Sequence, residues 1–66
     1  MEKVIKVEGM MCPHCEARVR SSLESVEGVT EVIASHKTGE AIVKSDKEIP
    51  FDTLKSIVEE QGYKVL

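Results

Sequence analysis

The sequence predicts an α+β fold in which two helices cover one face of a four-stranded antiparallel sheet. Three observations predict it. The chain has 66 residues, which suffice for a single small domain, 1–66. Its hydrophobic patterns follow one another in the order strand, helix, strand, strand, helix, strand. A short polar turn, Lys37-Thr38-Gly39, separates the two middle strands, so these two strands form a hairpin.

The first half of the chain is predicted to hold two strands and the helix between them. Residues 3 to 8 alternate between apolar and charged side chains, which is typical of a strand, and Gly9 ends it. From Pro13 to Glu27, apolar residues recur every three or four positions, which predicts a helix with one buried face. Gly28 follows as its C-terminal stop. Val29 to Ser35 is rich in β-branched residues and is predicted as the second strand.

The second half is predicted to repeat the alternation of strand and helix. Ala41 to Val43 forms the third strand. A second helix runs from Pro50 to Gln61 and stops at Gly62, although Ile49 before it offers no capping side chain. Tyr63 to Leu66 closes the sheet as a short fourth strand. This order is the split βαβ, or ferredoxin-like, arrangement.

Composition excludes several classes of function. The net charge is −3 with basic residues scattered, and one Phe and one Tyr are too few to stack bases, so no nucleic acid is expected as a partner. No apolar run approaches the ~20 residues of a membrane span, so direct membrane insertion is not expected. The N-terminus lacks a signal-peptide core, which predicts a cytoplasmic protein if Met1 is the true start. A chain that starts at Met1 and ends within a strand is expected to be a free-standing protein. No catalytic triad or phosphate loop is present, so the chain is not expected to be an enzyme.

The informative segment is Gly9-Met10-Met11-Cys12-Pro13-His14-Cys15. With Pro13 at the first helical position, Cys12 lies at or near the N-cap and Cys15 about one turn into the helix. Free N–H groups and the helix dipole favour thiolates there. Two thiolates three residues apart can converge on one soft ion, and a two-sulfur site suits low-coordinate Cu(I) better than tetrahedral zinc. A disulfide between them would close too short a loop to stabilise the fold.

The chain resembles the heavy-metal-associated domain family, and within it the small bacterial copper chaperones. The family motif Gly-Met-Thr-Cys-x-x-Cys is met by residues 9 to 15, and further agreement extends over nearly the whole chain, at Val19, Leu23, Gly28, Val29 and Gly62-Tyr63. The resemblance implies a ferredoxin-like fold that binds Cu(I) through Cys12 and Cys15. It also implies transfer of the ion, one thiolate at a time, to a related domain of a copper-transporting P-type ATPase.

The metal and the assembly stay open at this point. Met11 stands where the family has Thr, and His14 lies between the cysteines, where it is either a third ligand or an exposed residue of the helix start. Histidine binds zinc as readily as copper, so Zn(II) or another soft heavy metal is an alternative cargo for a carrier or sensor domain. A dithiol redox protein is a further alternative, because Cys-x-x-Cys at a helix start also occurs in thioredoxins. A metal-bridged homodimer is possible, since the dithiol is exposed.

Other side chains near the loop have two interpretations each. In the resembling family the Met at the position of Met10 points into the core, so we expect packing rather than ligation. Tyr63 either packs at the C-terminus or, as the resemblance implies, shields the metal loop. His36 is expected to be a solvated loop residue. Arg18 and Arg20 lie on the outer surface of the first helix, where they are either simply solvated or orient the chain on an acidic partner.

Overall fold

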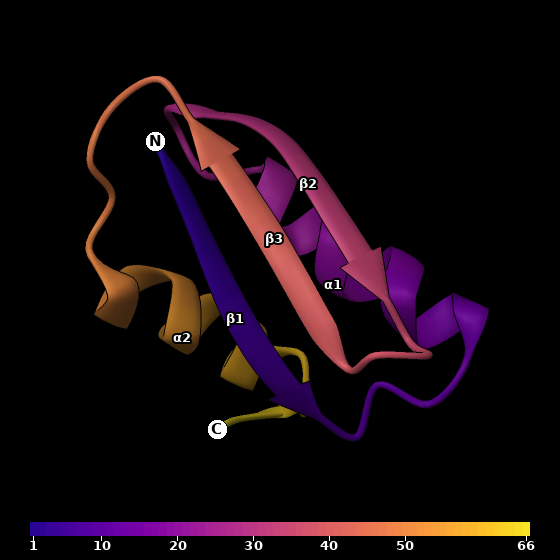
Figure 1. Cartoon of the computed structure of the whole chain (residues 1–66). Coiled ribbons are helices and arrows are strands. Elements are labelled where there is room, and N and C mark those ends of the chain that lie inside the picture. The colour runs from indigo at the N-terminus through magenta and orange to yellow at the C-terminus, as the bar shows by residue number, and fades with distance from the viewer.

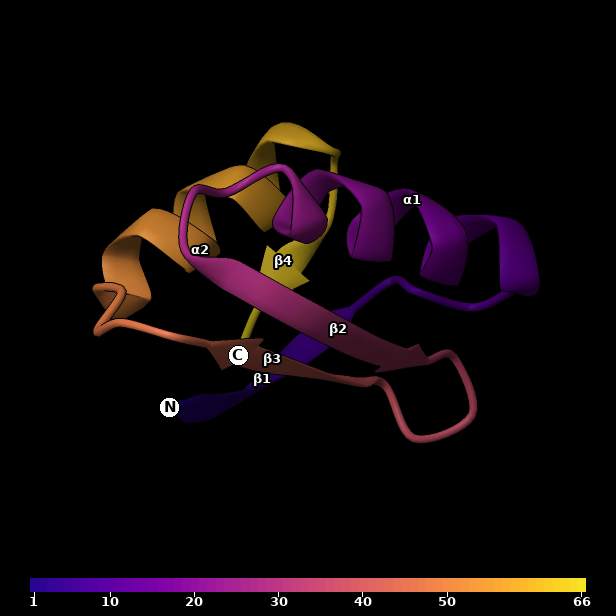
Figure 2. The ribbon, with the colours of Figure 1, turned by 90° about the horizontal axis from the view of Figure 1, so that it is seen from above.

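The computed structural model describes residues 1–66 and confirms the predicted α+β fold. The elements are β1 (Glu2–Glu8), α1 (Pro13–Glu24), β2 (Val29–Ser35), β3 (Glu40–Ser45), α2 (Phe51–Glu60) and β4 (Lys64–Val65). The sheet has the order β2-β3-β1-β4, and all its neighbouring strands are antiparallel. Figure 1 looks onto the sheet with both helices behind it, and Figure 2, turned by 90°, shows both helices on the same side.

The end of α1 differs from the prediction. The helix ends at Glu24, three residues before the predicted end at Glu27. Ser25 occupies the C-cap, and its hydroxyl donates a hydrogen bond of 2.6 Å to the carbonyl of Ser22, which competes with continued helix. Val26, which has helical spacing in the sequence, packs against the core from the turn that follows. A turn can therefore bury a side chain at the position where a longer helix would have placed it.

The remaining boundaries agree with the prediction to within a few residues. Pro50 precedes α2 without any side-chain cap, as its sequence indicates, and Gln61 is the C-cap. The sheet differs in length only: β1 begins one residue earlier than predicted, β3 extends beyond 41–43 at both ends, and β4 is confined to Lys64–Val65.

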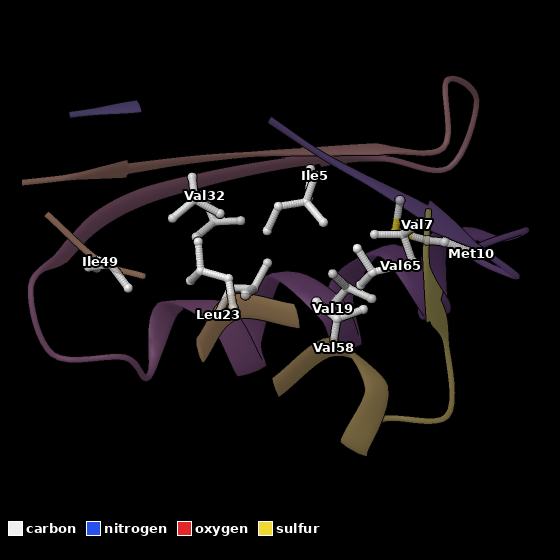
Figure 3. Packing of buried hydrophobic residues seen from close by; sticks show 12 residues of the cluster. Ile5, Val7, Met10, Val19, Leu23, Val32, Ile49, Val58 and Val65 are labelled. Atoms are coloured by element: carbon white, nitrogen blue, oxygen red, sulfur yellow. The ribbon is translucent and has the colours of Figure 1, made fainter. Parts of the chain in front are cut away.

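The core lies between the sheet and the two helices (Figure 3). It consists of twelve apolar residues and contains no buried polar side chain: Ile5, Val7, Met10, Val19, Leu23, Val32, Ala41, Val43, Ile49, Leu54, Val58 and Val65. Val7, Met10 and Val65 gather at the end of the core where the chain passes from β1 towards α1 (Figure 3). Neither helix is long and apolar enough to cross a membrane.

Candidate metal centre

The loop that carries the cysteines leaves the central strand β1 and enters α1 (Figures 1 and 2). Gly9 begins the loop with a φ of 97°, a backbone conformation that glycine adopts without strain. Met10 is 3% exposed and belongs to the core, so the expected packing role is confirmed. Met11 is 80% exposed, which puts its side chain in solvent. The buried Met10 thus anchors the loop from below.

The two cysteines come together at the N-terminus of α1. Cys12 is the N-cap, and its sulfur accepts a hydrogen bond from the backbone N–H of Cys15, with a distance of 3.4 Å. Pro13 is the first helical residue, as its fixed φ favours. The Cys12 thiol also donates to the sulfur of Cys15, and the two Sγ atoms are 3.1 Å apart. Both cysteines are half-buried and free of any disulfide. The predicted N-cap position of Cys12 is therefore confirmed.

The surroundings of Cys15 favour its thiolate. A hydrogen bond from the Tyr63 hydroxyl is the largest cause that lowers the pKa of Cys15, followed by the bond from Cys12 and one from the backbone N–H of Met11. Together they lower that pKa from 9.0 to about 7. The same contact with Cys15 raises the pKa of Tyr63, because the phenol keeps its proton to donate it. Cys15 can therefore be a thiolate near neutral pH.

Tyr63 packs against the core and also contacts the cysteine loop. Its ring is half-buried and packs against the core, while its hydroxyl interacts with Cys15. A Cβ atom added at Gly9 would lie 3.4 Å from Cδ1 of Tyr63, so the ring also contacts the start of the loop. Tyr63 thus connects the chain after α2 to the cysteine loop.

His36 does not occupy the solvated position that was expected from its place beside the hairpin turn. Its side chain is only 26% exposed, and its Nδ1 atom lies 3.0 Å from Oε1 of Glu16 in α1. The backbone N–H of His36 donates to the same oxygen at 2.9 Å. Glu16 was not singled out in the sequence, because nothing there shows that residues so far apart meet. The pair fastens the β2–β3 turn to the first turn of α1.

The other candidate side chains stay apart from the two sulfurs. His14 is exposed, and Arg18 and Arg20 are exposed on α1. No group of three or more His, Cys, Asp or Glu side chains gathers anywhere in the structure with the spacing of a metal site. At the loop, the structure therefore brings Cys12 and Cys15 together and adds no third side chain of these types.

Comparison with known proteins places this geometry in a family. The model of the heavy-metal-associated domain matches residues 4–64. The copper chaperone CopZ of Staphylococcus aureus is 33% identical over 66 residues, which cover 98% of this chain and 97% of the relative.

Solved structures agree with that match. A CopZ metallochaperone superimposes with a TM-score of 0.93 at 33% identity, with both chains covered completely. The yeast copper transporter domain Ccc2a, solved in its apo and Cu(I)-loaded states, has a TM-score of 0.88 at 33% identity over 97% of this chain and 89% of that domain. The match extends over strands, helices and cysteine loop alike, and this chain therefore belongs to the heavy-metal-associated domain family.

Proposed function

We propose that this chain is a copper(I) metallochaperone. In this proposal, the single domain of residues 1–66 binds Cu(I) as cargo through Cys12 and Cys15 and passes it to a domain of the same family on a copper-transporting P-type ATPase. Both steps take place in the cytoplasm, where thiols are kept reduced. The chain is a metal carrier and not an enzyme, in keeping with its family and relatives.

The pair of thiols is the observation that carries the proposal. Their sulfurs lie 3.1 Å apart at a helix N-terminus, and the pKa of Cys15 is lowered to about 7. Thiolates are soft ligands that favour Cu(I), and two of them satisfy its preference for few ligands. A closed zinc site needs four ligands, and no further His, Cys, Asp or Glu joins the pair. The donor set therefore fits Cu(I) better than Zn(II).

The relatives support the same cargo. One is a copper chaperone in name, one is a metallochaperone in name, and the third is a copper transporter domain studied with Cu(I). A chaperone and a transporter domain that share one fold can present matching dithiol loops to each other. Cu(I) then passes between them through intermediates in which each protein contributes sulfur ligands.

The two cysteines differ in a way that supports an order of exchange. Cys15 packs against the core and interacts with the Tyr63 hydroxyl, whereas Cys12 lies outside the group that packs on the core. Cys12 can therefore leave the metal or accept it with little rearrangement of the fold. We assign the first and last contact with Cu(I) to Cys12, and the more persistent contact to Cys15.

The binding step is tested by anaerobic titration of the reduced protein with Cu(I) against a chromophoric chelator, with Zn(II) titrated in parallel. Wild type retains about one Cu(I) per chain or less, and Cys12→Ser and Cys15→Ser each lose it to the chelator, because one thiolate alone holds Cu(I) weakly. Met11→Ser is the matched control, because it removes an adjacent sulfur that is 80% exposed, and it keeps wild-type retention.

The transfer step needs a separate assay. Cu(I)-loaded protein is mixed with the purified heavy-metal-associated domain of a copper ATPase, and the copper on each is measured after chromatographic separation. Equilibration within the mixing time, faster than release of Cu(I) to buffer, is expected for direct exchange. Retention of Cu(I) by either serine variant at wild-type strength would contradict the ligand assignment, and equal competition by Zn(II) would contradict the choice of cargo.

A further inference from the structure

The sheet face that the helices leave uncovered bears an apolar row across three strands. Val4 of β1 pairs with Ile42 of β3, and Ile42 pairs in turn with Ile33 of β2. Val4 is 52% exposed and Ile33 is 45% exposed, whereas four residues next to the row along these strands are buried in the core: Ile5, Val32, Ala41 and Val43. Figure 1 looks directly onto this face, and Figure 2 shows that no other element of the chain covers it. Three branched side chains in register form a continuous strip rather than isolated exposed residues.

A row of mostly charged side chains lies on each side of this strip, two residues further along each strand and on the same face of the sheet. Towards the N-terminus of β1 the row is Glu2, Lys44, Glu31. Towards the metal loop the row is Lys6, Glu40, Ser35. Within the chain, Lys44 forms an exposed ion pair with Glu31 at 3.5 Å, whereas Glu2, Lys6 and Glu40 form none. On β1, and likewise on β3, the charge in one row is thus opposite in sign to the charge in the other row.

This pattern is complementary to itself under one two-fold rotation. Consider a second copy stacked face to face on the first and related to it by a two-fold axis that runs along the apolar row. Each strand then lies over the same strand of the second copy, which runs in the opposite direction. Glu2 then faces Lys6 of the second copy, and Lys44 faces Glu40, which gives four opposite-charge contacts around a closed apolar strip. An axis parallel to the strands would instead place Lys44 against Lys44 and Glu40 against Glu40. The charges therefore select one arrangement and oppose the other.

We propose that the open sheet face is an interface for a second copy of this chain. The apolar row Val4, Ile42 and Ile33 forms its centre, and the Glu2–Lys6 and Lys44–Glu40 contacts form its rim. In this arrangement the strands of the two copies run in opposite directions, so the two cysteine loops lie at opposite ends and stay free. The dimer thus differs from one in which a metal ion bridges two loops, and it requires neither cysteine nor metal.

The size of the face sets the strength of the association. Three short strands offer less than the ~800 Å² per partner of a standard interface, which places the dimer in the weak, reversible class. Its charged rim is exposed to solvent, so salt weakens it further. We therefore expect self-association at protein concentrations on the order of 0.1–1 mM and low ionic strength.

Sedimentation equilibrium of the metal-free, reduced protein tests the proposal, with a concentration series in low and high salt. Wild type and the double variant Cys12→Ser with Cys15→Ser dimerise equally. Ile33→Ser removes one of the three apolar side chains of the strip and abolishes the dimer. Glu40→Lys and Lys44→Glu each place like charges opposite one another and weaken it about tenfold.

A mixture of the two charge variants provides the matched control for specific pairing. Glu40→Lys has Lys at both positions and Lys44→Glu has Glu at both, so each is repelled by itself but complements the other. The equimolar mixture therefore associates at least as tightly as wild type. Thermal denaturation of each variant confirms that it is folded. A wild type that stays monomeric at 1 mM in low salt, a mixture that fails to associate, or a dimer that disappears in the cysteine double variant overturns the proposal.

Discussion

Glu16 of α1 and His36 of the β2–β3 turn, 20 residues apart in the sequence, are joined by two hydrogen bonds. One carboxylate oxygen of Glu16 accepts both of them, from the backbone N–H of His36 and from its ring. The contact lies one residue beyond Cys15, in the helical turn that carries the thiols. It thus connects the sheet to the base of the cysteine loop.

The contact between Glu16 and His36 predicts a specific loss of stability in acid. The hydrogen bonds from His36 lower the pKa of Glu16 in the folded protein. The stabilisation of the fold by ionised Glu16 is therefore complete above the pKa of about 4.3 that a glutamate has in the unfolded chain. It is lost as the pH falls through the lower pKa of Glu16 in the folded protein. We expect the melting temperature of wild type to fall more steeply than that of Glu16→Gln between about pH 5 and pH 3, as followed by circular dichroism. Glu24→Gln, an exposed carboxyl on the same helix, is the control and keeps the wild-type slope.

Tyr63→Phe is predicted to raise the pKa of Cys15. The hydroxyl of Tyr63 is the largest cause that lowers this pKa to about 7, and its removal leaves the thiolate without that donor. The midpoint of the ¹³Cβ shift of Cys15 against pH should move upwards towards 9.0, and alkylation of Cys15 at pH 7 should slow accordingly. The ring still packs, so the circular dichroism spectrum is unchanged. An unmoved midpoint would show that the hydroxyl does not act on the thiol.

Leu23→Ala is predicted to destabilise the fold by about 2–5 kcal/mol, because it leaves a cavity between α1 and the sheet. Leu23 is 0% exposed and lies within the core. Urea denaturation measures the change in the free energy of unfolding. Leu66→Ala removes the same number of atoms from a side chain that is 67% exposed, and it should cost less than about 0.5 kcal/mol. Similar losses for the two variants would contradict the packing described here.

Reversal of charge at Arg18 and Arg20 is predicted to slow copper transfer without a change in copper affinity. Both arginines are exposed on the helix that carries the thiols, and complementary charge accelerates encounter more than it deepens affinity. The double variant Arg18→Glu with Arg20→Glu should transfer several-fold more slowly at low salt by stopped-flow mixing with an acceptor domain. Lys55→Glu on α2 is the control and keeps the wild-type rate. Unaltered kinetics at low salt would remove the arginines from the docking surface.

The sequence predicted the order of the elements and the place of the thiols, because both follow from local rules. Alternation in β1, the spacing of apolar residues in α1 and Pro13 after Cys12 depend on neighbours in the chain. The end of α1 was predicted three residues too far, since the spacing of Val26 is the same whether a helix or a turn buries it.

Contacts between distant segments could not be predicted from local patterns. His36 was expected in solvent, because no feature of its neighbours shows that the turn meets Glu16. The hydroxyl of Tyr63 reaches Cys15 for a similar reason: the short β4 and the loop after β1 come together only once the sheet is assembled. For Tyr63 a resemblance to other sequences supplied what spacing alone could not.

A last consequence follows from Cys12 as the N-cap of α1. Its sulfur already serves as the acceptor for a backbone N–H that has no partner within the helix. In the proposed function the same atom also releases and receives the cargo, so helix capping and metal exchange are thermodynamically linked. A Cys12 thiolate that leaves Cu(I) returns to an acceptor role within its own chain rather than to bulk water. In that proposal the metal-free loop keeps its helix cap, and each delivery leaves it ready for the next ion.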